Sequence, residues 1–433
     1  MPIKAVPNWV VAVGVVVTIG AGGELSELAK KGLTQNPLLH SYLHQLNQAR
    51  YQTESQKGQL FPTFSAQLYA GRSKYQYDYP TEIVKYNQVT KGYTLSLSMP
   101  LFNKQIYDSI EEGKKREEYY RLQVTQFKQQ LIEKIGESYL GVVGVREQLR
   151  LLEEELELLR QLKEGAYLKF KAHLIGEVEY REAVAKYWEK RGEVERYRSK
   201  LKSQIAQLKY WAGIGGGLQV KGVQFNSGAL LSLPLPSQFT GAHSPELQIA
   251  KINMEVAKAQ WKQARDKLWP SLNLRGSYSD TKTTDSITKR KDYELAVYLN
   301  IPLYNRADRK QVEGVREGYL SYRARYLDKK RELTAQFEGL LEELKGLKTQ
   351  LQALEKGVLA GALNLKKGEE SYKNRLISIF DLYSAIESYY STKLQLIDTQ
   401  RQLLQNYLQL LQLQGELSLD KIGEIEKLYL KTN

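Results

Sequence analysis

The sequence predicts a mainly α-helical fold with two β-hairpins, on three observations: an internal repeat, a period-two alternation and a heptad period. Paired prolines mark the repeat. The offset is 208 residues for two pairs and 202 for a third, so a difference of six residues falls in one loop of a duplicated unit. The sequence therefore contains two copies of one fold. The pairs are Pro37 with Pro245, Pro62 with Pro270, and Pro100 with Pro302.

A helical pattern opens each copy, over residues 37–61 and 245–269. Proline stands in the first turn of both segments, where its missing N–H costs no hydrogen bond. We therefore expect one helix at the start of each copy.

Strands are expected next, because apolar residues occupy every second position before Pro100 and Pro302, and this period is typical of a strand with two different faces. The preceding runs, residues 63–73 and 271–279, alternate less regularly. Each copy should therefore form a hairpin, with residues 75–90 and 280–290 as polar connecting loops. The alternating residues are Tyr93, Leu95, Leu97 and Met99 in copy one and Leu295, Val297, Leu299 and Ile301 in copy two.

Long helices should follow Asn103 and Asn305, where leucine and valine recur at spacings of three and four, the heptad period of coiled-coil packing. The pattern breaks at residues 171–176 and, 202 residues later, at 373–378. The chain is expected to turn back there, giving two long antiparallel helical hairpins. A helix as long as the first would span about 100 Å at ~1.5 Å per residue. The heptad residues are Val142, Val145, Leu149, Leu152, Leu156 and Leu159, then Leu344, Leu347, Leu351, Leu354 and Val358.

These patterns divide the chain into five segments. The first holds one basic residue, Lys4, then an apolar run and small residues, which is the layout of a secretory signal peptide. A buried strand or a membrane anchor is the alternative for it. The segments are residues 1–23 as signal peptide, 24–213 as first repeat, 214–243 as irregular connector, 244–415 as second repeat, and 416–433 as C-terminal tail.

The composition excludes several kinds of chemistry. The 433 residues include no Cys and four His, which excludes disulfides, thiolate metal sites and a cysteine nucleophile. His40 and His44 have a spacing that can chelate zinc, but Gln248 and Ile252 stand in their places in the second copy. We expect no catalytic residue, cofactor or metal. The net charge of +14 is equally compatible with a nucleic-acid partner, with an anionic membrane surface as partner, and with a basic exterior that is simply solvated.

Four strands per chain are too few to close a membrane barrel, since the smallest such barrels use about eight. If the strands cross a membrane, chains must assemble. Two chains would supply eight strands and three would supply twelve, and only the wider ring leaves an open bore. The same assembly would pack the helical hairpins side by side into a tube.

Motifs at four places carry a family resemblance. They are ELSELAKKGL at residues 24–33 followed by Gln35-Asn36-Pro37, the strand exits MPLF at 99–102 and IPLY at 301–304, and residues 372–385. In these the sequence resembles TolC-like outer-membrane efflux proteins, over residues 24–415. The resemblance implies a homotrimer with a shared 12-strand β-barrel in the outer membrane and an α-helical barrel in the periplasm.

The resemblance also implies the function and the partners. The chain would be the exit channel of a tripartite efflux pump or a type I secretion system, conducting substrates passively with no chemistry of its own. Its partners would be a periplasmic adaptor protein, an inner-membrane pump of the RND or ABC type, and outer-membrane lipid, with no nucleic acid. The alternative function is a soluble, basic coiled-coil scaffold or nucleic-acid-binding protein.

Site residues are likewise implied by the resemblance. Asp381 matches a ring of carboxylates that narrows the lumen and selects cations, although a helix-starting carboxylate is the structural alternative. Ser384 replaces a second acidic ring. Tyr372 and Glu179 match two members of a latch that holds the tip closed, but Ile377 stands where its arginine would be, and Arg375 or Arg181 is the candidate substitute. The adaptor-docking tip would comprise Leu174, Ile175, Gly176, Leu376, Ile377 and Ser378.

Overall fold

The structure is a computed structural model that describes residues 23–218, 220, 222–283 and 290–432. Apart from Gly23, the expected signal peptide lies outside the described residues. The chain forms two compact units. We call them the sheet unit, Ser41–Val124 with Leu247–Lys329, and the tip unit, Met1–His40 with Thr125–Glu246 and Lys330–Asn433.

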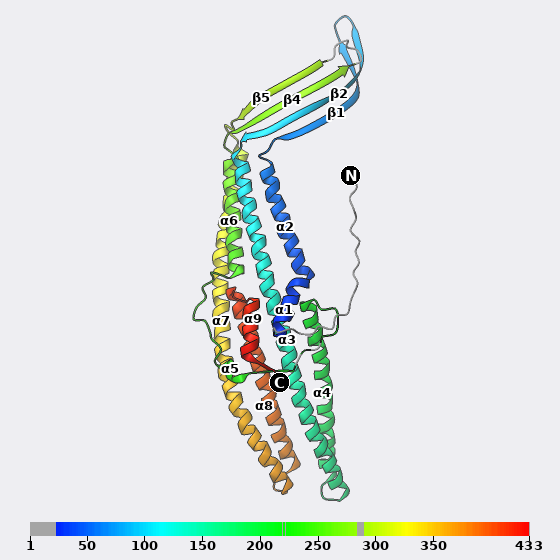
Figure 1. Cartoon of the computed structure of the whole chain (residues 1–433), viewed down its shortest axis with the longest axis vertical. Helices are drawn as coiled ribbons and strands as arrows, with labels where there is room; N and C mark the ends of the chain where they lie inside the picture. Colours follow the sequence, from blue (N-terminus) through cyan, green and yellow to red (C-terminus); the bar gives the residue numbers. More distant parts are fainter. Residues whose placement is uncertain (1–22, 219, 221, 284–289, 433) are drawn as a thin grey trace. The chain divides into compact units, whose positions relative to one another are not determined.

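The described elements repeat in order along the chain (Figure 1), as the sequence predicts. In chain order they are α1 (Glu24–Gln35), α2 (Pro37–Gly58), β1 (Thr63–Asp78), β2 (Ile83–Phe102), α3 (Lys104–Lys171), α4 (Glu177–Ala212), β3 (Val223–Phe225), α5 (Ser227–Leu231), α6 (Pro245–Asp266), β4 (Ser271–Thr283), β5 (Arg290–Asn300), α7 (Arg306–Lys373), α8 (Ile379–Gln414), α9 (Leu419–Tyr429) and β6 (Leu430–Thr432). The run α2–β1–β2–α3–α4 corresponds to α6–β4–β5–α7–α8.

The long helices confirm the heptad prediction. Helices α3 and α7 have 68 residues each, and α4 and α8 have 36 each. The two breaks in the pattern also fall where predicted, because α3 ends at Lys171 and α7 at Lys373. No helix within the described residues is both long and apolar enough to cross a membrane.

The sheet unit holds four antiparallel strands in the order β1-β2-β4-β5 (Figure 1). Both predicted hairpins are confirmed, but in both the strands extend into the segment predicted as a loop. Strand pairing continues until Asp78 lies opposite Ile83, so most of the segment 75–90, expected as a loop, is strand. Tyrosine, valine, isoleucine and threonine, which favour strands, occur throughout this segment and explain the difference. In the second hairpin, pairing continues at least to Thr281 opposite Arg290.

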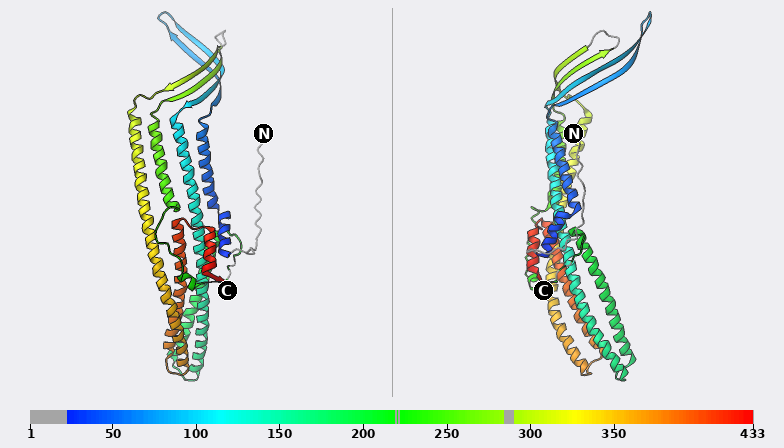
Figure 2. Two further views of the ribbon diagram at one scale, coloured as in Figure 1. Left: turned by 60° about the vertical axis from the view of Figure 1, so that its left-hand side comes forward. Right: turned by 45° about the vertical axis from the view of Figure 1, so that its right-hand side comes forward.

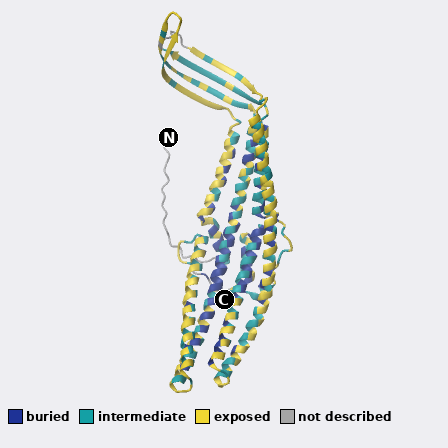
Figure 3. Cartoon of the chain, turned by 180° about the vertical axis from the view of Figure 1, so that it is seen from behind, coloured by how far each residue is buried: buried dark blue, intermediate teal, exposed yellow. Residues whose placement is uncertain are grey.

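The strand register separates an apolar row from a polar row. Phe64 lies opposite Leu97, Leu97 opposite Gly276, and Gly276 opposite Leu295. Because side chains alternate between faces along a strand, the adjacent row belongs to the other face. The two end residues of the apolar row are exposed in the single chain, Phe64 by 76% and Leu295 by 74%, whereas Leu97 and Gly276 are half-buried. Figure 3 shows exposed residues along the strands. The polar row is Ser65, Ser96, Ser277 and Glu294.

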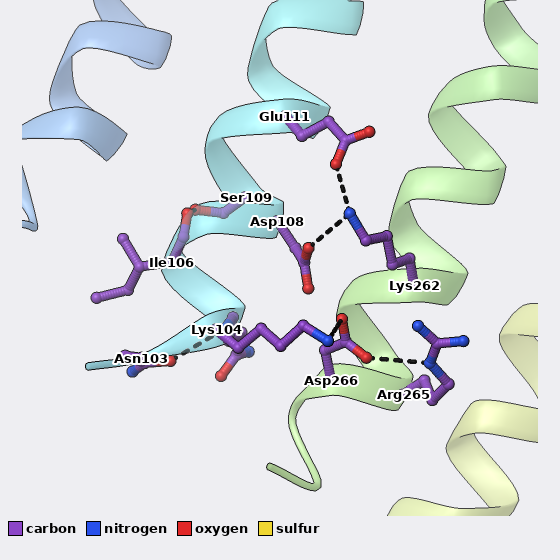
Figure 4. A network of polar contacts seen from close by, with 10 residues as sticks. Asn103, Lys104, Ile106, Asp108, Ser109, Glu111, Lys262, Arg265 and Asp266 are labelled. Atoms are coloured by element: carbon purple, nitrogen blue, oxygen red, sulfur yellow. Dashed lines mark hydrogen bonds and ion pairs between the residues drawn. The ribbon is translucent and has the colours of Figure 1, made fainter. Parts of the chain in front are cut away.

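Two buried aspartates tie together the helices nearest the sheet. Asp108 lies near the start of α3, after β2, and Asp266 ends α6, before β4. Their exposed fractions are 3% and 1%. Lys262 Nζ lies 3.1 Å from Asp108 Oδ1, and Lys104 Nζ lies 2.9 Å from Asp266 Oδ2 (Figure 4). Arg265 Nε lies 3.0 Å from Asp266 Oδ1.

These contacts neutralise carboxylates that would otherwise be costly to bury. Burial raises the pKa of Asp108, and a hydrogen bond with Lys262 opposes that effect. Since β2 and β4 are neighbouring strands, the network fixes the two helix ends that lead into the middle of the sheet.

The core of the tip unit uses the heptad positions. Leu152 of α3 and Leu344 and Leu351 of α7 are completely buried. Figure 3 shows the buried residues concentrated along the helices. At these positions the predicted heptad residues are therefore already buried within a single chain.

Residues 419–432, within the expected C-terminal tail, form helix α9 and strand β6. Strand β6 pairs with β3 of the connector, and α9 packs against α1. The carboxylate of Glu426 in α9 accepts hydrogen bonds from the N–H groups of Leu25 at 3.0 Å and Ser26 at 3.2 Å. A side chain at Gly23 would collide with that carboxylate. The end of the described chain thus caps the first helix.

A buried glutamate in the tip unit makes stability depend on pH. Glu133 of α3 is 8% exposed. Burial, followed by the negative charge of Glu137, raises its pKa from 4.5 to about 7. Between these pH values the folded chain holds a proton that the unfolded chain has released. The free energy of unfolding therefore falls as pH rises through that window.

Substituting Glu133→Gln should remove this dependence, because the amide has no proton to lose. We expect the variant to match the wild type below pH 4.5 and to gain up to about 3 kcal/mol relative to it above pH 7, at ~1.36 kcal/mol per pKa unit. Thermal unfolding across this pH range measures the difference. Glu54→Gln, at an exposed residue, is the matched control. A wild-type slope that persists unchanged in Glu133→Gln would contradict the assignment.

Candidate functional site

Two loops of equal length close the helical hairpins of the tip unit (Figure 2). Residues 172–176 join α3 to α4, and residues 374–378 join α7 to α8. The N–H of Leu174 donates to the carbonyl oxygen of Lys169 at 2.8 Å, and the N–H of Leu376 donates to that of Ser371 at 2.9 Å. These bonds connect equivalent positions, so the duplication extends to the conformation of the loops.

Carboxylates cap the helices that follow both loops. Asp381 Oδ2 accepts hydrogen bonds from the N–H of Ser378 at 3.0 Å and from its hydroxyl at 2.7 Å. The N–H of Asp381 donates in return to Ser378 Oγ at 3.2 Å, which completes a capping box. In the first loop Glu179 Oε2 accepts from the N–H of Gly176 at 3.3 Å. The helix-starting interpretation of Asp381 is therefore confirmed.

The electrostatics keep Asp381 ionised. Hydrogen bonds from Ser378 lower the pKa of its carboxyl, and the residue is exposed. A capped, exposed carboxylate remains available for ions, so the capping role leaves the predicted pore role open. Ser384, one turn later, donates its hydroxyl hydrogen bond to the carbonyl oxygen of Phe380 at 3.0 Å.

A cation links the two hairpins near the loops. Lys169 of α3 donates from Nζ to the hydroxyl of Tyr372 in α7 at 3.3 Å. The same Nζ lies 4.3 Å from the centroid of the Tyr372 ring, a cation–π distance. Glu179 instead binds within its own loop, and Arg181 pairs with Glu177 at 2.5 Å. The structure therefore brings Tyr372 together with Lys169, a residue that no motif in the sequence marks.

A second contact between the hairpins involves α4 and α8. Lys186 Nζ lies 3.9 Å from Glu387 Oε2. Nearby, a polar cleft of about 540 Å³ is lined by residues of both hairpins, including Glu155, Lys190 and Asp398. Glu155 is buried and ion-paired with Lys190 at 3.0 Å. The two hairpins thus contact each other through charged groups of α4 and α8.

The loop residues expected to dock an adaptor lie largely at the surface. Leu174 is 58% exposed and Leu376 is 75% exposed. Gly176 and Ser378 are exposed, and Ile175 and Ile377 are half-buried. Each loop therefore exposes one leucine side chain.

Comparison with known proteins decides the family. A sequence profile described as outer membrane efflux protein matches residues 28–213 and 238–416, across both repeats. The chain belongs to the outer membrane efflux protein family. It is accordingly an outer-membrane exit channel for efflux, and the alternative of a soluble scaffold or nucleic-acid-binding protein is unsupported. No curated protein matches the chain in sequence.

Solved structures of outer-membrane channels share the fold. CusC is similar with a TM-score of 0.81 at 16% identity, covering 94% of this chain and 99% of that one. VceC from Vibrio cholerae is similar with a TM-score of 0.77 at 15% identity, covering 90% of this chain and 96% of that one. CmeC from Campylobacter jejuni is similar with a TM-score of 0.76 at 15% identity, covering 98% of this chain and 97% of that one. The mainly helical fold class with strand hairpins is therefore that of an efflux channel.

The contact between Lys169 and Tyr372 should hold the two hairpins of the efflux protein together. Lys169→Met keeps the length of the side chain but removes both interactions, whereas Tyr372→Phe removes only the hydroxyl. We expect amide hydrogen exchange in residues 168–176 and 371–378 to accelerate on the order of fivefold in Lys169→Met, equivalent to about 1 kcal/mol, and less in Tyr372→Phe. The exposed Lys171→Met is the control. Equal acceleration in both lysine variants would refute the link.

Proposed function

We propose that three copies of the chain assemble into one continuous duct, with twelve strands forming its outer-membrane part. The open edges of the sheet support this. Strands β1 and β5 are the outermost of the four, so each has one edge of backbone N–H and C=O groups without a strand partner among the described residues. In a membrane such groups need partners, and β5 of one chain can pair with β1 of the next.

The two rows of the sheet support the same arrangement. The apolar row, whose end residues Phe64 and Leu295 are exposed, fits lipid, and the row of Ser65, Ser96 and Ser277 fits a water-filled lumen. This is the single observation that best carries the proposal. A sheet inside a water-soluble scaffold would need its apolar face covered.

Transport through this duct is passive, and the energy comes from partners. An inner-membrane pump of the RND or ABC type supplies substrate, and a periplasmic adaptor connects that pump to the two loops of each chain. The exposed Leu174 and Leu376 provide the contact for the adaptor, together with Ile175, Gly176, Ile377 and Ser378. The protein performs no covalent chemistry of its own, and its cargo is either small molecules or secreted proteins.

The loop end of the tube is its gate. The link from Lys169 to Tyr372 holds the hairpins of one chain together in the closed state, with Glu179 and Asp381 capping the helices beside it. Three Asp381 carboxylates around the axis form a cation-binding constriction. Because Ser384 stands where a second acidic residue would be, the constriction has one acidic ring.

Purification in detergent followed by mass measurement tests the assembly. The expected species is a trimer that conducts ions in a planar lipid bilayer. A monomer that stays in solution without detergent and has no conductance would exclude the proposal.

Substituting Asp381→Asn tests the constriction. The amide oxygen can still accept from Ser378, so the helix cap is preserved while the charge is lost. We expect the cation-to-anion permeability ratio to fall on the order of threefold, since three partly screened charges act on each passing ion. Reversal potentials in salt gradients measure this ratio. Ser384→Asp, which adds a carboxylate, should raise it, and unchanged selectivity in both variants would remove these residues from the pore.

A further inference from the structure

The four long helices end in the same backbone conformation but with different residues. A residue with positive φ lies just beyond each helix: 56° at His173 and 57° at Arg375, two residues after the ends of α3 and α7, and 67° at Gly213 and 79° at Gly415, directly after α4 and α8. This left-handed region favours glycine, because a Cβ there crowds the backbone. Among the described residues, His173 and Arg375 are the ones other than glycine with positive φ.

Packing accounts for the two glycines. A side chain at Gly415 would collide with the backbone oxygen of His243, and one at Gly213 would place its Cβ 3.2 Å from the Cβ of Gln35. His173 and Arg375 are instead exposed, so packing within the chain does not explain why these positions carry large side chains.

Helix-end electrostatics do not explain them either. A cation near a helix C-terminus interacts favourably with the helix dipole. However, Lys171 and Lys373 already lie in the last turns of α3 and α7. Helix α8 has no basic residue in its last turn and still ends in Gly415. The dipole therefore does not select a basic residue at this position.

Each of these residues stands directly before an exposed leucine. In this type of helix end the residue after the left-handed position usually packs back on the helix. Leu174 and Leu376 remain 58% and 75% exposed. Both loops therefore present the same pair of residues, a side chain with N–H donors followed by an exposed leucine. The two pairs occupy equivalent positions of the repeat, offset by 202 residues.

We propose that His173 and Arg375 determine the specificity of the docking loops by binding carboxylates that border an apolar surface on the adaptor. This rests on the proposed function, in which these loops dock the adaptor. Imidazole and guanidinium both donate N–H hydrogen bonds to carboxylate oxygens, and the leucines fill the adjoining apolar surface. The complex offsets the backbone strain that the free loops carry.

The partner is first identified with the full-length channel in its own cells. A photo-reactive amino acid replaces the exposed Ala172 or Asn374, and the cross-linked peptide is identified by mass spectrometry. We expect a periplasmic protein whose cross-linked segment has Asp or Glu beside apolar residues. A segment without a carboxylate would overturn the inference.

Affinity of the captured adaptor for the detergent-solubilised channel then tests the two residues. The double variants His173→Gly with Arg375→Gly and His173→Asn with Arg375→Asn both tolerate the backbone. Glycine has no side-chain donor, and asparagine replaces the longer imidazole and guanidinium with a short, uncharged amide. We expect the Kd to rise at least tenfold in both, while the thermal midpoint of the glycine variant equals or exceeds that of the wild type. Added salt should weaken adaptor binding by the wild-type channel more than binding by either variant. Lys373→Gln, an exposed cation in the same loop region, should change Kd less than about twofold.

A third double variant, Leu174→Ser with Leu376→Ser, separates this inference from the proposed function. If the leucine variant binds weakly while the glycine and asparagine variants bind like the wild type, the loops dock the adaptor but His173 and Arg375 do not determine specificity. If the leucine variant also binds like the wild type, or no periplasmic partner is captured, docking through the loops fails, and the inference fails with it.

Discussion

The exposed apolar face of the four-stranded sheet is the constraint on which the rest of the structure depends. Burying such a face contributes roughly 25 cal/mol for each Å² of apolar surface removed from water. The row from Phe64 to Leu295, whose end residues stay exposed in the single chain, therefore requires an apolar surrounding. The outer edges of β1 and β5 require backbone partners in that surrounding. In the proposed assembly, lipid meets the first requirement and neighbouring copies of the chain meet the second.

Much of the fold could be predicted because duplication and periodicity are signals within the sequence itself. The offset of 202 residues locates both helix breaks, and α3 and α7 end at Lys171 and Lys373, where the heptad pattern stops. The length of the first β-hairpin could not be predicted in the same way. Its outer half alternates polar and aromatic residues without a clear apolar face, so only the pairing of Asp78 with Ile83 reveals the strand. Helix α9 is short, with 11 residues, and its role depends on contact with α1.

The candidate site was predictable only where chemistry is local. The capping of α8 by Asp381 follows from its position three residues after Ser378. The link from Lys169 to Tyr372 joins residues 203 positions apart, and it depends on how two hairpins approach each other, which no local pattern encodes. The positive φ of His173 and Arg375 was also hidden, since glycine is the usual sequence signal for that conformation and neither residue is glycine.

The cap that Glu426 places on helix α1 joins two ends of the described chain, because Leu25 and Glu426 lie 401 positions apart. The N–H groups of Leu25 and Ser26 obtain these acceptors only once helix α9 has folded back on helix α1. A chain that stops before residue 426 lacks both hydrogen bonds, so these two N–H groups at the start of the helix need other acceptors.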